Sequence, residues 1–255
     1  MKKVYFIAML LLFTTNLYSK EFLNTILHLN FGGMYSFVSG GGIINEEKNE
    51  IEGHELFPSS RISHYSTAYC FTLDVAPMKP ILLGLEEHAI KFGVRGAYRF
   101  HFMQQEVRSK GVEYKGNVFN YNSWMVGPVM HYAPFISPSS VDYEYTALGG
   151  FTFYALFGKI DGDLTAFPAL RKAGGSVGNS SSKISGYKMD FGMGAEISVC
   201  SINFGVNLYY SRVNYKMKEP VYAVDKRKGT LNEGCIELYF GIPVEFIIKP
   251  IIKRF

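Results

Sequence analysis

The feature that most constrains the fold is an alternation of apolar and polar side chains that persists for a dozen residues or more. The clearest segment alternates Tyr187, Met189, Phe191, Met193, Ala195, Ile197 and Val199 with Gly186, Lys188, Asp190, Gly192, Gly194, Glu196 and Ser198. Side chains of a β-strand point alternately to its two faces, so the segment is predicted to be a strand. Strands in globular proteins usually run about 5–6 residues, whereas a tilted strand needs about 9–11 to cross a bilayer. The length favours a membrane-spanning strand.

Eight such segments follow one another along the chain. They cover residues 27–37, 65–75, 90–102, 118–132, 141–157, 186–199, 202–211 and 236–247. We therefore predict an all-β fold, an eight-stranded antiparallel transmembrane barrel of up-and-down meander topology. Alternation is less regular in the fourth segment, where Pro128 predicts a bulge or a local kink because proline cannot donate to the ladder. Ten strands stay possible if a long loop contains an extra hairpin.

The size of the side chains indicates which face points outward. The polar face combines glycine and alanine with charged residues, and the interior of an eight-stranded barrel is only wide enough for side chains to fill. The apolar face carries Phe, Leu, Ile, Val and Met, with Tyr near strand ends, as in a lipid-facing band with aromatic girdles. A lipocalin, whose apolar face lines the inside, is the alternative.

The connections between the segments differ in length. Those expected to be long and polar are Ser39 to His64, Gln104 to Asn117, Lys159 to Lys183 and Lys216 to Leu231. The shorter ones lie around 137–140 and 200–201, while Pro77 to His88 is longer than a tight turn. Outer-membrane barrels have long extracellular loops and short periplasmic turns, so we expect both termini in the periplasm.

Two segments carry a resemblance to a known family. Residues 235–246 resemble the closing strand of small bacterial outer-membrane β-barrels of the OmpW/OmpX and porin-like kind, and 127–129 resemble an inner strand of the same group. In pattern the resemblance covers the whole mature chain. It implies residence in the bacterial outer membrane, contact with its lipid, and insertion by the barrel-assembly machinery after escort by periplasmic chaperones. The basic residues of 249–254 depart from the family pattern, in which the last strand ends at a terminal aromatic residue.

The N-terminus indicates export. Residues 1–19 combine a short basic start, an apolar run and a small residue at Ser19, which predicts a cleaved signal peptide followed by one barrel domain over 20–255. A retained N-terminal anchor is the alternative. Without Lys2 and Lys3 the net charge falls from +4 to +2. This balance predicts no nucleic-acid partner.

Charged residues on the polar faces form the first candidate site. Lys91, Arg95 and Arg99 share one face of one strand, and acidic residues on other strands supply the opposite charge. The predicted lumen charge cluster contains Lys91, Arg95, Arg99, Asp74, Asp190, Glu196, Glu237 and Glu245. One interpretation is a salt-bridged plug, because buried charges must be paired. The other is an anion-selective path that uses the three basic residues as its filter.

The long loops form the second candidate site. Glu46, Glu47 and Glu50 lie in one loop, and Arg171 and Lys172 lie in another. The two loops could pair with each other, bind an extracellular ligand, or remain solvated. Binding residues are often found on loops held by a rigid scaffold.

Other chemistry is not expected. We predict no disulfide among Cys70, Cys200 and Cys235. No metal-ligand spacing, cofactor motif or nucleophile motif is evident in the sequence, so we predict that the protein is not an enzyme. His101 and His131 are expected to be solvated or interfacial. The sequence predicts a structural or surface-interaction barrel with a filled lumen. A narrow channel for small or apolar solutes, as the OmpW resemblance implies, is the alternative.

Overall fold

The computed structural model describes residues 26–39, 50–51, 54–55, 65–84, 88–109, 112–134, 136–138, 145–146, 149–166, 180–199, 202–219 and 228–244. Its strands are β1 (Leu27–Ser39), β2 (Glu50–Ile51), β3 (His54–Glu55), β4 (Tyr65–Val75), β5 (Ile81–Leu83), β6 (His88–Ser109), β7 (Val112–Pro134), β8 (Ser137–Pro138), β9 (Tyr145–Thr146), β10 (Gly149–Ala166), β11 (Ser180–Val199), β12 (Ile202–Met217) and β13 (Lys228–Pro243). Within these ranges no helix is long and apolar enough to cross a membrane.

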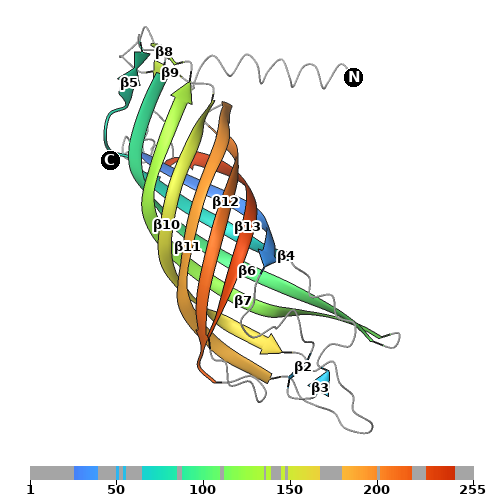
Figure 1. The fold of residues 1–255 in the computed structure, drawn as a ribbon. Coiled ribbons are helices and arrows are strands. Elements are labelled where there is room, and N and C mark those ends of the chain that lie inside the picture. The colour runs from blue at the N-terminus through green and yellow to red at the C-terminus, as the bar shows by residue number, and fades with distance from the viewer. Residues whose placement is uncertain are drawn as a thin grey trace, which may run out of the picture.

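Eight of the strands close into a barrel. Antiparallel pairing joins each strand to the next in the order β1, β4, β6, β7, β10, β11, β12 and β13, and β13 returns to β1 (Figure 1). The predicted fold, an eight-stranded antiparallel meander, is confirmed. The additional short strands lie outside the ring. β2 pairs with β3 and β8 pairs with β9, whereas β5 pairs with the first residues of β6, His88 to Ile90.

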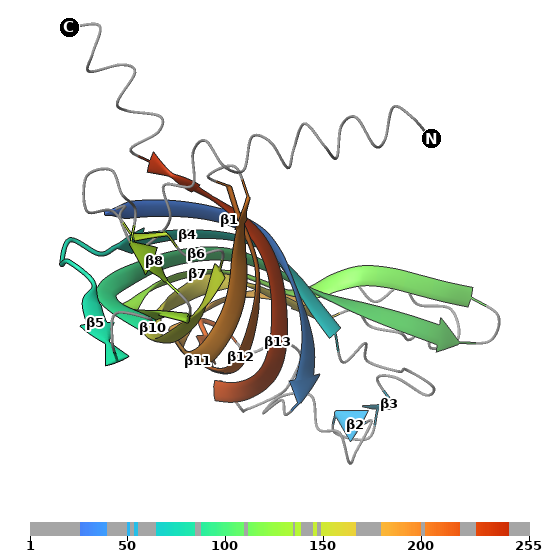
Figure 2. The same ribbon diagram turned by 90° about the horizontal axis from the view of Figure 1, so that it is seen from above.

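The strands are longer than predicted at one end of the barrel. We call the end at which β1 begins the near rim and the opposite end the far rim. The predicted loop 104–117 is wrong, because β6 and β7 continue as a paired hairpin up to the contact between Ser109 and Val112. This hairpin stands away from the other strands (Figure 2). The predicted loop 159–183 is also too long, since β10 ends at Ala166 and β11 begins at Ser180.

Other boundaries also differ from the prediction. The fifth strand begins at Gly149 and not at residue 141, and the last strand runs from Lys228 to Pro243 rather than from 236 to 247. Pro128 produces no bulge: β7 keeps one register with β10 on both sides of it. The pairing is only interrupted where Gly127 and Pro128 face Ala155 and Leu156. Proline has no N–H to donate, so the ladder loses contacts without shifting.

The alternating pattern decides what the barrel presents inside and outside. In β4, Tyr69, Phe71 and Leu73 are exposed, while the intervening Cys70 and Thr72 are buried. The same rule holds around the ring, so large apolar side chains cover the exterior and the polar set points into the lumen. The prediction that the apolar face points outward is confirmed, and the lipocalin-like alternative is wrong.

Toward the far rim the pattern inverts. In β12, the exposed positions change from Leu208 and Tyr210 to Arg212 and Lys216, and the buried positions change from Asn203 and Asn207 to apolar residues. The buried apolar residues at this level, drawn from β7, β10, β11, β12 and β13, are Phe119, Tyr121, Ile160, Leu164, Ile184, Val213, Tyr215, Met217 and Leu231. At this end the wall formed by β7 and β10 to β13 is therefore polar outside and apolar inside, like the strands of a water-soluble protein.

Candidate functional site in the barrel lumen

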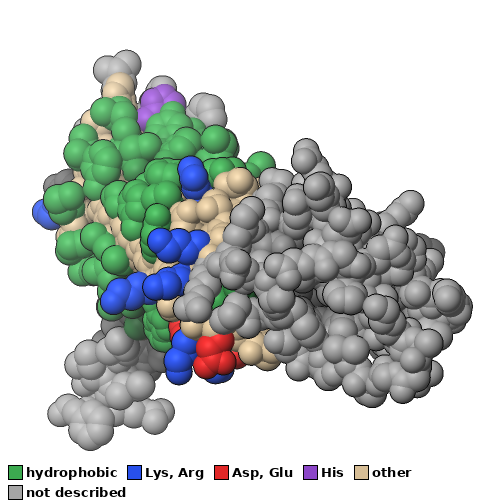
Figure 3. Space-filling model, turned by 60° about the horizontal axis from the view of Figure 1, so that its bottom comes forward, with side chains coloured by type: hydrophobic (Ala, Val, Ile, Leu, Met, Phe, Trp, Pro, Cys, Tyr) green, Lys and Arg blue, Asp and Glu red, His purple; other side chains and the backbone are tan. Residues whose placement is uncertain are grey.

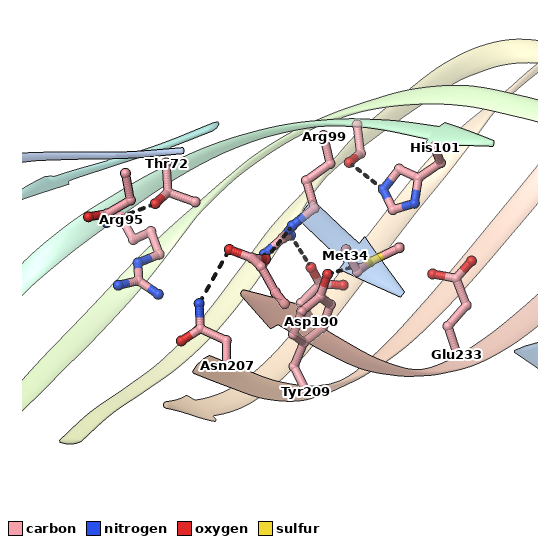
Figure 4. A network of polar contacts seen from close by, with 12 residues as sticks. Met34, Thr72, Arg95, Arg99, His101, Asp190, Asn207, Tyr209 and Glu233 are labelled. Carbon is pink, nitrogen blue, oxygen red and sulfur yellow. Dashed lines mark hydrogen bonds and ion pairs between the residues drawn. The ribbon is translucent and has the colours of Figure 1, made fainter. Parts of the chain in front are cut away.

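The centre of the lumen is occupied by Arg99, which has no exposed surface. Its guanidinium projects from β6 and donates to Asp190 of β11 at 2.5 Å and to Glu237 of β13 at 3.1 and 3.2 Å (Figure 4). Both partner strands lie three places from β6 around the ring, in opposite directions. The guanidinium also lies 4.6 Å from the ring centroid of Tyr209. One side chain thus joins three strands across the barrel.

A second ion-pair group lies closer to the near rim. Arg95 binds Asp74 of the neighbouring strand through two bonds, of 2.6 and 2.7 Å. His131 lies between two carboxylates, with Nε2 3.4 Å from Asp74 and Nδ1 4.0 Å from Glu196. The hydroxyl of Tyr239 donates to Glu196 at 2.9 Å. Bidentate pairing fixes the arginine in position as well as neutralising its charge.

A third group lies on the far-rim side of Arg99. Lys188 of β11 donates to Glu233 at 3.1 Å, lies 3.2 Å from the Nε2 atom of His101, and is 3.3 Å from the hydroxyl of Tyr121. The Tyr121 hydroxyl donates to Glu233 at 3.0 Å. Tyr121 belongs to β7, which lies directly opposite β13, the strand of Glu233, in the ring. The Lys188 ammonium is also 3.9 Å from Asp190, which links this group to Arg99.

Glycines give the tyrosine rings room on the lumen side. A Cβ atom added at Gly205 would lie 2.2 Å from the ring of Tyr239, its partner across β12 and β13. One added at Gly192 would meet the ring of Tyr154 at 2.5 Å. The guanidinium of Arg95 lies 4.7 Å from the ring centroid of Tyr154. Small residues beside large rings therefore position the aromatic faces against which the arginines lie.

The predicted lumen residues have different outcomes. Asp74, Arg95, Arg99, Asp190, Glu196 and Glu237 are brought together in these contacts, and Lys91 is buried on the same face of β6. Glu245 lies outside the described residues, as do Glu46, Glu47, Arg171, Lys172 and Cys200. Glu50 belongs to β2, where its backbone pairs with Glu55. The two loop groups thus have no described side-chain geometry.

Four residues of the lumen network were not among the predicted site residues. Lys188, Glu233, His101 and His131 are all buried in the network. The expectation that His101 and His131 are solvated or interfacial is wrong. His101 and Lys188 lie on the polar faces of predicted strands, so the alternation contained their signal. Glu233 gave no signal because it precedes the predicted start of its strand.

Cys70 and Cys235 are free and buried in the lumen. They lie on β4 and β13, which are separated by β1. Among the described residues, no group of three His, Cys, Asp or Glu side chains is arranged to hold a metal ion.

The chain is similar to outer-membrane proteins of known structure. One is the outer membrane protein OprG from Pseudomonas aeruginosa, with a TM-score of 0.43 and 12% identity over 85% of this chain and 95% of that chain. Another is Ail, the attachment invasion locus protein of Yersinia pestis, with a TM-score of 0.31 and 10% identity over 85% of this chain and 98% of that chain. No family model and no curated protein matches the chain. The fold assignment itself rests on the strand pairing described above.

Proposed function

We propose that the protein is an integral barrel of the bacterial outer membrane. The support is the apolar exterior, which on β11 runs from Tyr187 to Ile197. At a rise of about 3.3 Å per residue this stretch is about 33 Å long, and a tilt of about 40° reduces its height to about 25 Å, the height of a lipid-facing band. Trp124, Tyr187 and Tyr210 end the band toward the far rim, where aromatic girdles lie.

We further propose that the lumen is closed and that the protein acts as a structural or surface-interaction barrel, without an enzymatic role. The observation that carries this proposal is the contact of Arg99 with carboxylates from both sides of the ring. Among the described lumen residues four cationic side chains accompany five anionic ones, and Arg95 and Arg99 of the basic stripe are each paired with carboxylates. The apolar cluster toward the far rim adds a barrier to ions, because it offers no ligand that replaces their water.

Interaction would then take place outside the membrane. The loop residues Glu46, Glu47, Glu50, Arg171 and Lys172 remain candidates for contact with an extracellular ligand. Assembly would follow the route of other such barrels, through periplasmic chaperones and the barrel-assembly machinery.

A narrow channel that opens sideways for apolar solutes is the second candidate. The observation in its favour is the interrupted pairing between β7 and β10, where Gly127 and Pro128 face Ala155 and Leu156. This interruption of the hydrogen-bonded ladder is adjacent in sequence to Tyr154, whose ring is buried in the lumen.

Single-channel conductance of the refolded protein in a planar bilayer tests the closed lumen. We expect no discrete steps from protein whose folding is verified by its altered migration on a gel before boiling. Reproducible steps whose ion selectivity changes in the double variant Arg95→Ala/Arg99→Ala would refute a closed lumen and establish an ion path. Uptake of an apolar dye into vesicles, compared between wild type and Pro128→Val, would test the sideways route separately.

A further inference from the structure

Basic side chains gather on one side of the exterior, directly beyond the apolar band. Arg212, Lys216 and Lys218 point outward from β12 and its end, and Lys228 points outward from β13. Lys and Arg side chains border the hydrophobic surface in this region (Figure 3). Along the described part of the chain these four basic side chains are offset only in part, by the exposed Glu219 that follows Lys218.

The arrangement of two of these residues is unfavourable without a ligand. Lys216 and Lys228 are direct partners across β12 and β13, and like charges in this position destabilise a sheet. Among the described residues neither forms an ion pair with an acidic side chain. Lys183, two strands from Lys228, differs because it binds Asp163 at 2.9 Å. A bound anion would remove the repulsion between Lys216 and Lys228.

An apolar groove of about 930 Å³ follows the outer face of the barrel from Phe92 on β6 to Phe37 on β1, and its section between β12 and β13 lies next to the basic group. Gly234 contributes to its wall, together with Phe37, Ile236 and Tyr210. A Cβ atom added at Gly234 would meet no atom within 4 Å, so the groove is open at this point. Gly234 is the cross-strand partner of Tyr210, and Arg212 follows Tyr210 on the same face of β12. The groove and the basic group are therefore continuous.

We propose that this surface binds one class of lipid, whose headgroup carries a phosphate without a compensating amine. The phosphate would contact Arg212, Lys216 and Lys228, and an acyl chain would lie in the groove at Gly234. The proposal rests on the membrane location proposed above. At the band edge the headgroups of the bilayer are at the level of Arg212, and long lysine side chains can extend along the surface toward them. An amine-bearing headgroup would place its own positive charge against the lysines.

Native mass spectrometry of protein in neutral detergent tests the charge requirement. The protein is offered equal amounts of phosphatidic acid and phosphatidylcholine with matched chains, and the two adducts are compared. We expect a strong preference for phosphatidic acid. Lys216→Gln/Lys228→Gln should lower the preference about 25-fold, because each basic residue near a lipid surface contributes about a factor of five. Lys216→Arg/Lys228→Arg keeps the charge and should retain the preference. No preference in the wild type, or one unchanged by the glutamines, would overturn the proposal.

A pair of glycine variants tests the groove. Gly234→Leu obstructs the groove beside Tyr210. Gly33→Leu is the matched control, since Gly33 also points outward with no atom within 4 Å of an added Cβ but lies at another surface depression. We expect only Gly234→Leu to weaken retention of phosphatidic acid. Equal effects of the two substitutions would show that the acyl chain does not use the groove.

Two further arms identify the source of a failure. Inorganic phosphate in excess should leave the lipid adduct in place, because it has no chain for the groove; full displacement would mean a free-phosphate site and would overturn the lipid assignment. Insertion into pure phosphatidylcholine vesicles is measured by altered gel migration. A protein that does not insert contradicts the membrane function and this proposal together. A protein that inserts without lipid preference contradicts this proposal alone.

Discussion

Replacement of Arg99 by methionine should destabilise the barrel strongly. The substitution keeps an apolar stem but removes the guanidinium that binds Asp190 and Glu237, both of which are buried. Two carboxylates would then share a closed region without their common cation, and the contact with the Tyr209 ring would also be lost. Breaking a buried pair by removal of one partner costs about 3–5 kcal/mol, whereas an exposed pair contributes about 0–1 kcal/mol. We therefore expect a loss of about 3–5 kcal/mol in the free energy of unfolding.

Denaturant unfolding in neutral micelles measures this loss. Trp124, the single tryptophan of the chain, is 65% exposed on the outer surface of the barrel, so in micelles its emission reports release from the apolar environment. Arg212→Met is the matched control, because Arg212 points outward and forms no ion pair with the other described residues. Surface substitutions usually change stability by within about 0.5 kcal/mol.

A triple variant distinguishes lost pairing from lost packing. Arg99→Met/Asp190→Asn/Glu237→Gln removes all three charges with little change in shape, so it should recover part of the stability lost in Arg99→Met. If Arg99→Met and Arg212→Met unfolded at the same denaturant concentration, the cross-barrel pairs would not stabilise the fold. The inference that the network closes the lumen would then lose its energetic basis.

Three further outcomes follow from the packing. Gly205→Ala should lower the free energy of unfolding by about 1–3 kcal/mol, because the added methyl group displaces the Tyr239 ring. Gly234→Ala, with open space around it, should leave the free energy of unfolding unchanged, and equal losses in the two variants would contradict the ring contact. Val213→Asn places an amide in the apolar far-rim cluster and should cost about 1–3 kcal/mol, so an unchanged denaturation midpoint would mean that water reaches this cluster. Cys70 and Cys235 should resist alkylation until the barrel unfolds, and modification of the folded protein, located by peptide mass spectrometry, would show an accessible lumen.

The closed barrel could be predicted because one physical rule determined it. Side chains alternate along a strand, and a barrel exposed to lipid needs one apolar face throughout. Strand ends were not predictable in the same way. In residues 159–166 and 180–185 the outward positions become polar and the inward positions become apolar. A prediction that expects one apolar outward face throughout therefore assigns these residues to a loop. Inside β10, Ile160 and Leu164 continue the buried row, so the period of two was present but its phase had changed.

The candidate site was predictable in its members but not in its pairing. Alternation assigned Arg95, Arg99 and Asp190 to the lumen, since each lies on a polar face. It could not show that Arg99 contacts strands on both of its sides, because such contacts depend on ring closure and register. Glu233 and His131 were missed for different reasons: one fell before a predicted strand, and the other was expected at an interface. The loop candidates gain no geometry from the described residues.

The inverted polarity toward the far rim connects the fold, the proposed closure of the lumen and the basic surface. A strand that ended with the membrane would need only one pattern. In the proposed membrane location these strands would continue into water, and their exterior becomes polar where Tyr210 is followed on the same face by Arg212. The interior must then become apolar, because a sheet stabilised in water buries an apolar face. Residues such as Val213 and Met217 meet that need in the space beyond the ion pairs. The same change of phase thus places apolar side chains beyond the ion pairs and, in the proposed membrane location, cationic groups at the level of the lipid headgroups.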